Sequence, residues 1–225
     1  LAFTRRYPSD LSTTFRNVVN TLNLNGGRYL INSISIAIAV AMIGTIIAFS
    51  TAYLTARVKT KYSKYLHLIT ITSTAVPGIV LGLSYVLVFK TSFIYGTLAI
   101  LIMVNLIHFI SAPYLMMYDS FGKINENLEA VGQTLGIGRL RMIKDVFIPQ
   151  SKATIFEMGS YFFVNCMMTI SAVSFLATTA NKPISLMINQ FEAQMQLENV
   201  AVVSLAILII NLLMKVLVKA LTSRT

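Results

Sequence analysis

The side chains that could perform acid–base, nucleophilic or metal chemistry are few in this sequence. Its 225 residues include eight Asp and Glu, two His and one Cys. His67 and His108 have no acidic neighbours in the apolar stretches around them, so the sequence predicts neither a metal site nor a Ser-His-Asp arrangement. It also has no Gly-x-x-x-x-Gly-Lys-Ser/Thr phosphate loop. We therefore expect no catalytic residues, no metal and no cofactor.

Two pairs of polar residues lie inside long apolar stretches, at spacings that place both members on one side of a helix. Asn105 and His108 are three apart, and Asn165 and Thr169 are four apart. The first pair is expected to point into a helix bundle, where it contacts substrate or, alternatively, makes interhelical hydrogen bonds. The second pair is predicted to line a polar path for a hydrophilic solute, with helix packing as the alternative.

Pro77, Gly78 and Gly82 form a third group in another apolar stretch. A proline removes one backbone hydrogen bond and kinks a helix, whereas glycines permit close contact between helices. We expect a gate or hinge at this point. The alternative is a face of small residues that packs against a neighbouring helix.

A more polar segment, residues 119–152, has a pattern of its own. Apolar residues recur at helix-compatible spacings and three glycines interrupt them, which predicts two short helices joined by a bend. Glycine allows backbone angles and close approaches that a side chain would block. A solvated hairpin is the alternative. The apolar positions are Leu128, Val131, Leu135, Leu140, Ile143 and Val146, and the glycines are Gly132, Gly136 and Gly138.

The composition indicates which elements must position these groups. Apolar residues make up 56% of the chain and charged residues 12%, against roughly 25% charged in a soluble domain. A membrane-spanning helix needs about 20 apolar residues. The sequence therefore predicts an all-α integral membrane protein with five transmembrane helices. These spans are expected at about 29–56, 65–89, 93–118, 153–178 and 199–219.

The basic residues predict the orientation, because Lys and Arg are retained on the cytoplasmic side of short loops. Most of them lie in loop 57–64, loop 119–152 and the C-terminal tail, which places these parts inside. We expect residues 1–28 to be an extracytoplasmic loop segment, 29–220 the transmembrane domain and 221–225 a cytoplasmic tail. The net charge of +10 is distributed between the spans, so no nucleic-acid partner is expected.

The 119–152 segment resembles the cytoplasmic EAA loop of the membrane subunits of binding-protein-dependent ABC importers. The sequence Glu129-Ala130-Val131-Gly132-Gln133-Thr134-Leu135-Gly136, followed by Val146-Phe147-Ile148-Pro149, carries the resemblance. Gly136 and Pro149 have the family spacing, whereas the Glu-Ala-Ala positions fall on Ala130, Val131 and Gly132, so Glu129 is one residue early. In the second span, Pro77-Gly78-Ile79-Val80-Leu81-Gly82-Leu83-Ser84-Tyr85 is similar to the iron(III) and 2-aminoethylphosphonate permeases.

The resemblance implies a five-span permease core with a cytoplasmic coupling helix in a bacterial inner or plasma membrane. Its implied partners are a cytoplasmic ATP-binding subunit, an extracytoplasmic solute-binding protein, membrane lipid and a second permease core in the same chain or a homodimer. The solute is expected to be iron(III) or a phosphonate such as 2-aminoethylphosphonate. The coupling residues would be Glu129, Ala130, Gly132, Leu135, Gly136, Ile137, Gly138 and Pro149. Because such chains often carry two cores, we expect a longer protein of which this is the C-terminal core.

Two other function classes compete with this interpretation. An ion-coupled secondary transporter normally places a titratable carboxylate deep in a span, and no Asp or Glu lies deep in these stretches. An intramembrane enzyme needs Ser, His and Asp, or a metal cluster, at one depth. The ion-coupled transporter remains the principal alternative.

Overall fold

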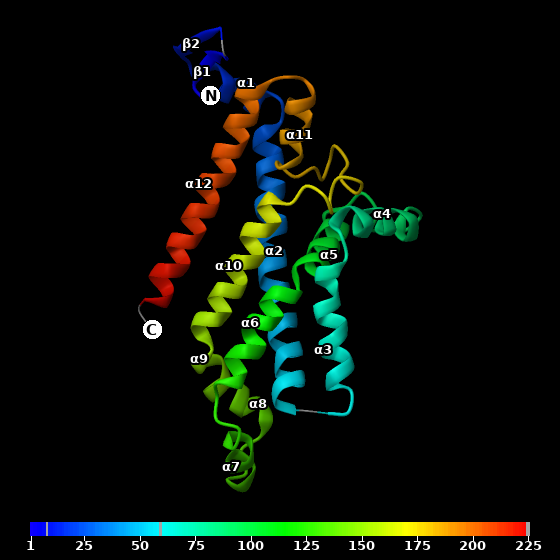
Figure 1. Cartoon of the computed structure of the whole chain (residues 1–225), viewed down its shortest axis with the longest axis vertical. Helices are drawn as coiled ribbons and strands as arrows, with labels where there is room; N and C mark the ends of the chain where they lie inside the picture. The colour runs from blue at the N-terminus through cyan, green and yellow to red at the C-terminus, as the bar shows by residue number, and fades with distance from the viewer. Residues whose placement is uncertain (8, 59, 224–225) are drawn as a thin grey trace.

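The computed structural model describes residues 1–7, 9–58 and 60–223, and these residues form an elongated helical bundle (Figure 1). The segments η1 and η3 are π-helical and η2 is a 3₁₀-helix. In chain order the elements are β1 (Thr4–Arg6), β2 (Asp10–Thr13), α1 (Arg16–Asn23), α2 (Gly26–Tyr53), η1 (Leu54–Val58), α3 (Ser63–Thr72), η2 (Ser73–Ala75), α4 (Gly78–Phe89), α5 (Leu98–Phe109), α6 (Ser111–Gly122), α7 (Leu128–Thr134), α8 (Arg139–Met142), η3 (Ile143–Phe147), α9 (Ile148–Gln150), α10 (Lys152–Met168), α11 (Leu186–Ala193) and α12 (Leu197–Thr222).

The long helix α2 is the centre of the bundle and packs against α10, α5 and α6 (Figure 1). Its closest approach to α10 depends on Gly44, since a Cβ atom there would lie 2.7 Å from the ring of Phe162. Tyr53, Phe121 and Phe147 pack edge to face where α2, α6 and η3 meet. Such aromatic pairs stabilise a helix junction by more than the burial of their apolar surface alone provides.

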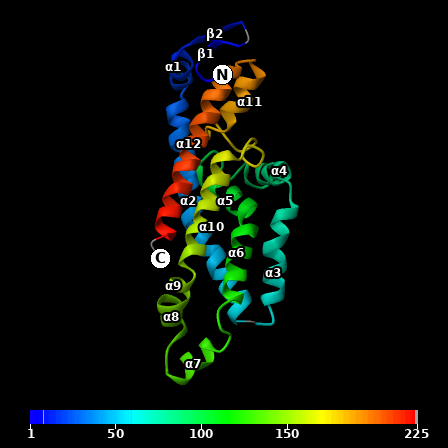
Figure 2. The same ribbon diagram turned by 60° about the vertical axis from the view of Figure 1, so that its left-hand side comes forward.

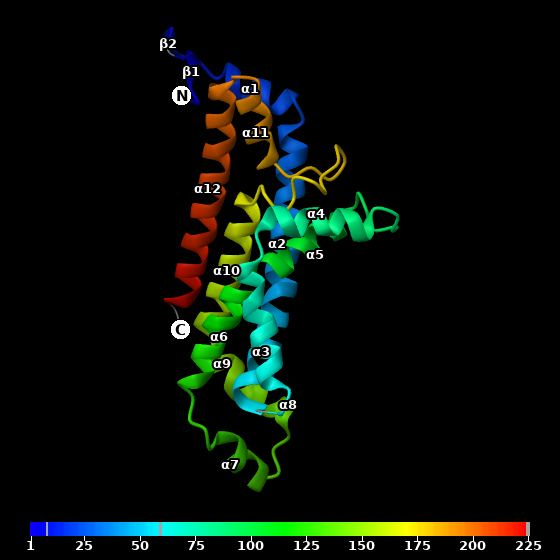
Figure 3. The same cartoon turned by 45° about the vertical axis from the view of Figure 1, so that its right-hand side comes forward.

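Among the described residues, only α2 with η1 and α12 are individually long and apolar enough to cross a membrane. The second and third expected spans are instead bent pairs. Helices α3 and α4 meet at 106° around Pro77, and α5 and α6 meet at 51°. Figure 3 shows α4 projecting sideways from the bundle. The count of five membrane crossings therefore remains a prediction.

The fourth expected span, residues 153–178, is corrected by the structure. Helix α10 ends at Met168, and Thr169 has an extended backbone with φ −67° and ψ 137°. The chain then runs through turns as far as α11. Two of its hydrogen bonds are buried inside the protein: the Ser185 hydroxyl donates to the Thr169 carbonyl (2.7 Å), and the Ile184 N–H donates to the hydroxyl oxygen of Ser33 in α2 (2.8 Å). Irregular backbone at membrane depth needs this kind of pairing inside the protein.

The N-terminal segment is more structured than the expected loop. Strands β1 and β2 form an antiparallel hairpin, so the described chain is not purely α-helical. The hairpin and α1 contact the first turns of α12, where the Tyr7 N–H donates to the Glu198 carboxylate (2.6 Å). At the C-terminal end, residues 224 and 225 of the expected tail lie outside the described residues.

Candidate functional site

The expected bend in the 119–152 segment is a helix-ending motif at Gly136. Helix α7 ends at Thr134, and Gly136 has a φ of +72°, in the left-handed region. The Ile137 N–H donates to the Gly132 carbonyl (2.8 Å), and the Gly136 N–H donates to the Gln133 carbonyl (3.1 Å). This is the pair of hydrogen bonds of a Schellman motif, which favours glycine at the left-handed position. The predicted role of Gly136 as a bend therefore has a local structural cause.

The other two glycines of this segment differ from one another. Gly132 is buried against Met142 of α8, and a Cβ at Gly132 would collide with the Met142 sulfur. Gly138 has φ −68° and ψ 152°, and a Cβ there would meet no atom of the described part of the chain within 4 Å. Gly132 thus holds α7 against α8, whereas neither the backbone nor the packing demands glycine at 138. Pro149 lies in the first turn of the short helix α9, where its missing N–H is tolerated.

Helix α7 lies at the end of the molecule opposite the N-terminal hairpin (Figures 2 and 3). Val131 is 51% accessible, Leu135 just after the helix is 69% accessible, and Ala130 is exposed, as are the polar side chains of Gln133 and Thr134. Ile137, by contrast, packs against the hydrophobic core. The end of this short helix therefore presents a few exposed apolar side chains beyond the bundle.

The Glu129 side chain points toward the rest of the bundle. Its two carboxylate oxygens accept hydrogen bonds from Nε and Nη2 of Arg57 in η1, at 2.7 and 2.5 Å. Sequence reasoning treated Arg57 only as a topology marker and missed this contact, because 72 residues separate the two partners. The Glu129–Gly136 motif does not indicate which residue Glu129 pairs with. The basic residues of loop 57–64 indicate only that a positively charged partner is available there.

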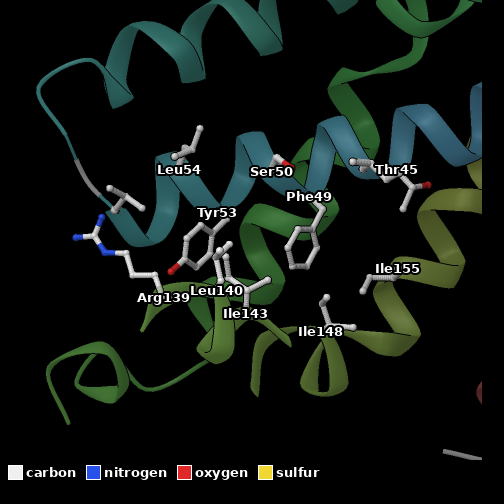
Figure 4. A pocket seen from close by; sticks show the side chains of 12 residues that line it. Thr45, Phe49, Ser50, Tyr53, Leu54, Arg139, Leu140, Ile143, Ile148 and Ile155 are labelled. Atoms are coloured by element: carbon white, nitrogen blue, oxygen red, sulfur yellow. The ribbon is translucent and has the colours of Figure 1, made fainter. Parts of the chain in front are cut away.

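A second contact that was not predicted from the sequence joins α3, α6 and η1 near Arg57. The Tyr114 hydroxyl of α6 hydrogen-bonds Nδ1 of His67 in α3 (2.6 Å) and the hydroxyl of Thr55 in η1 (2.9 Å). Leu54 and Val58 of η1 also line an apolar groove of about 690 Å³. Figure 4 shows Phe49, Tyr53 and Ile155 lining it, with Arg139 at one end.

The second candidate region lies where α3 and α4 meet. Pro77 precedes α4 with φ −59° and ψ 138°, so the expected kink is a complete break in the helix. A Cβ at Gly82 would lie 2.5 Å from the Ala172 carbonyl oxygen, and one at Gly78 would collide with the Ser171 hydroxyl. The glycines therefore let α4 rest on the non-helical segment after α10, rather than on the neighbouring helix of the packing alternative.

The structure brings His108 to this same break. Its Cε1 atom lies 3.2 Å from the place where a Cβ of Gly78 would be. The Nδ1 atom of His108 is buried and has no hydrogen-bond partner within the part of the chain that the structure describes. The ends of discontinuous membrane helices form the substrate and ion sites of many transporters.

The remaining polar pairs are arranged differently from the expectation. Asn105 is 1% exposed and donates to the Leu101 carbonyl (2.7 Å) on its own helix. Asn165 is half-buried and donates to the Tyr161 carbonyl (2.8 Å), one turn back on α10. Because α10 ends at Met168, Asn165 and Thr169 do not share a helical face, which corrects the geometry assumed from their spacing.

At the end of the bundle away from α7, a polar pocket of about 530 Å³ is lined by residues of α2, α11 and the irregular segment after α10. Lys182 lies in it, donates to the Gln190 side-chain oxygen (2.5 Å) and has its ammonium 5.5 Å from the centre of the Tyr29 ring. Burial lowers the pKa of Lys182. No group of three or more His, Cys, Asp or Glu that could hold a metal occurs among the described residues.

Comparisons with solved structures show the fold. The chain superposes on the inward-facing MetNI methionine ABC transporter with a TM-score of 0.66 at 12% identity, covering 86% of this chain and 94% of that chain. It also superposes on a bacterial ABC transporter that imports the acidic polysaccharide alginate, with a TM-score of 0.72 at 15% identity, covering 97% and 85% of the two chains.

Comparisons of the sequence show the family. The chain is 27% identical over 183 residues to the ferric transport system permease protein FbpB of Actinobacillus pleuropneumoniae. That match covers 79% of this chain but only 27% of the relative, so the chain spans about a quarter of that protein's length. Residues 42–225 match a family model of inner membrane components. The chain therefore belongs to the family of binding-protein-dependent transport system inner membrane components, integral membrane permeases of ABC transporters.

Proposed function

We propose that this chain is the translocation subunit of an ATP-driven importer, through which a solute passes from an extracytoplasmic binding protein to the cytoplasm. Family membership over residues 42–225 supports the class. The observation that carries the proposal is α7, a short helix fixed by the bend at Gly136 that exposes Leu135 beyond the bundle. A simple connector between two spans needs no rigid apolar tip.

The proposed partner of α7 is a separate ATP-binding subunit, since this sequence has no phosphate loop of its own. Ala130, Val131 and Leu135 would enter a groove of that subunit, because they are the exposed apolar side chains of this element. Gly132, Gly136, Ile137 and Pro149 would hold the shape of the loop. A second permease core, in the same chain or a second copy, would complete the path across the membrane.

The proposed solute is iron(III). The ferric permease relative supports it, although the identity of 27% is low. A phosphonate such as 2-aminoethylphosphonate is the second candidate, on the resemblance of residues 77–85 to both groups of permease. The proposed path passes Asn165, Thr169, Asn105 and His108, and the break at Pro77 is the proposed gate.

Transport in proteoliposomes tests this function. The full permease, its ATP-binding subunit and its solute-binding protein are reconstituted, and radiolabelled iron(III) is presented with and without ATP inside. We expect accumulation that requires both ATP and the binding protein, and that stops with a hydrolysis-deficient ATP-binding subunit.

The other outcomes are informative in different ways. ATP-dependent uptake of 2-aminoethylphosphonate, with none of iron(III), would reject iron(III) and keep the importer class. Uptake driven by an ion gradient in the absence of ATP would reject the importer and favour the ion-coupled transporter.

A further inference from the structure

The side chain of Arg57 is buried, which would not be expected for an arginine at the start of a polar loop. Its side chain is 5% exposed, and it lies in the π-helical turn η1 that continues α2. A buried arginine is stable only when its charge is paired and its donors are used. Arg57 fulfils both conditions with groups from another part of the chain.

All five N–H donors of the guanidinium have acceptors. Two donate to the carboxylate of Glu129, from Nε (2.7 Å) and Nη2 (2.5 Å). The other three donate to backbone carbonyls at the end of α6 and just after it. These accept from Nη1 at Phe121 (3.3 Å) and Ile124 (2.9 Å), and from Nη2 at Asn125 (2.8 Å).

A third contact extends the connection to η3. The guanidinium carbon of Arg57 lies 5.3 Å from the centre of the Phe147 ring, a cation–π distance. Phe147 ends the π-helical segment η3, just as Arg57 lies within the π-helical η1. Such π-helical turns occur frequently at functional sites. One side chain thus joins the end of α2 to α6, α7 and η3.

This arrangement determines what Glu129 can do. The Glu129 side chain is 21% exposed and its two oxygens accept a bidentate arginine bond. Planar bidentate pairs of this kind are stronger and more directional than a lysine contact. Releasing Glu129 toward another subunit would leave the buried guanidinium without its counter-charge, which is strongly unfavourable. Glu129 is therefore committed to the permease.

We propose that Arg57 is a positioning residue, a clamp that makes the cytoplasmic end of the first long helix move as one body with α7. A displacement of α7 by the ATP-binding subunit would then pass directly to α2 through the Arg57–Glu129 pair. The proposal rests on the proposed function of α7 as the docking element. It assigns Glu129 to force transmission rather than to contact with the ATP-binding subunit.

A double-mutant cycle in the assembled transporter tests the clamp. The variants are Arg57→Gln, Glu129→Gln and their combination, with Arg57→Lys as the conservative change. Arg141→Gln is the matched control, because Arg141 is in the same loop region but is largely exposed and pairs only at 3.4 Å with Asp145. The measurements are the ATP-binding subunit that co-purifies and the ATP hydrolysis stimulated by the solute-binding protein.

We expect each single Gln variant to retain the ATP-binding subunit and to lose stimulated hydrolysis roughly tenfold, the effect of losing a charge-assisted hydrogen bond. The double variant should be no worse than either single variant, and Arg57→Lys should be intermediate. Arg141→Gln should behave as wild type. Multiplied losses in the double variant, or loss of the ATP-binding subunit with Glu129→Gln alone, would overturn the clamp.

A distance measurement keeps the proposal testable if a variant fails to fold. In a Cys166→Ser background, spin labels are placed at Leu54 in η1 and at Gln133 in α7, and a second pair at Gln133 and Lys219 in α12. The first distance should stay constant between nucleotide-free and ATP-bound states while the second changes. A change in the first distance would refute the clamp. Wild-type protein without stimulated hydrolysis would refute the proposed function instead.

Discussion

Gly136 shows how one residue can decide whether the loop keeps its shape. Its φ of +72° lies in the region that side chains with a branched Cβ rarely adopt. No atom of the described residues lies within 4 Å of a Cβ built at Gly136, so the constraint seen here comes from the backbone. The position therefore separates a conformational effect from a packing effect.

Gly136→Val is expected to weaken the bend by about 1 to 3 kcal/mol, the cost of a strained backbone at a branched residue. The permease should still insert, yet co-purify poorly with its ATP-binding subunit and fail to stimulate ATP hydrolysis. Gly138→Val is the matched control, since Gly138 has an ordinary φ of −68° and open space around it. Equal behaviour of the two variants would show that the bend has no part in docking.

Gly82 illustrates the opposite case, in which packing rather than backbone strain requires glycine. Gly82→Ala would place a Cβ 2.5 Å from the Ala172 carbonyl oxygen, a backbone atom that cannot turn away. We expect a loss of stability of about 1 to 3 kcal/mol, typical of overpacking. Thermal unfolding in detergent measures it, with Gly122→Ala as control because a Cβ there meets nothing within 4 Å. An equal decrease in the unfolding temperature of Gly82→Ala and Gly122→Ala would contradict the close contact at Gly82.

The sequence predicts the local interactions of the site but not the interactions between distant parts of the chain. The bend at Gly136 could be predicted because the glycine, the helix before it and the hydrogen bonds all lie within a few residues. The pairing of Arg57 with Glu129 could not, because spacing along the chain does not say which helix ends will meet. Glu129 was consequently expected at the docking surface, whereas its side chain points to η1.

At the scale of elements, hydropathy located the apolar segments but not their breaks. The stretch after Met158 is free of charges as far as Lys182, and it was expected to be helical to residue 178. The helix ends ten residues earlier, at Met168. Hydropathy measures transfer into an apolar environment and does not distinguish a helix from irregular backbone whose polar groups are paired inside the protein. The 106° angle at Pro77 has the same explanation, because proline predicts a kink but not its size.

The predicted translocation path runs along α10 beside Asn165, and a substitution on this helix tests it. Asn165→Leu removes a half-buried amide that donates to the Tyr161 carbonyl of its own helix. If a hydrophilic solute passes this face, uptake should fall at least about tenfold, equivalent to 1.4 kcal/mol. Expression and recovery of the ATP-binding subunit should not change.

The control for this prediction lies on the same helix. Thr154→Val removes a hydroxyl that donates to Ser120 (3.3 Å) near the start of α10, away from Asn165. It should leave uptake unchanged in the same proteoliposome assay. Normal uptake by Asn165→Leu at normal expression would place the path elsewhere and favour helix packing as the role of this residue.

The whole molecule has two chemically different ends. The N-terminal hairpin and α1 lie at one end, and α7 with the loop around it lies at the other (Figure 2). The described parts of loops 57–64 and 119–152 lie toward the α7 end (Figure 1). These two loops carry half of the chain's Lys and Arg, so the positive-inside rule assigns this end to the cytoplasm. The proposed docking of α7 requires this orientation, since ATP is available only inside the cell.

Labelling of single cysteines in intact cells tests the orientation of the whole chain. Cys166 is buried and is replaced by Ser, and single cysteines are introduced at Lys123 beside the coupling loop and at Arg16 in α1, both exposed. A membrane-impermeant maleimide should label the cysteine at position 16 from outside and reach the one at position 123 only after the membrane is opened. Both sites are exposed, so a difference in labelling reports membrane side rather than burial. Labelling at position 123 in intact cells would invert the topology, place α7 outside and remove the ATP-binding subunit as its partner.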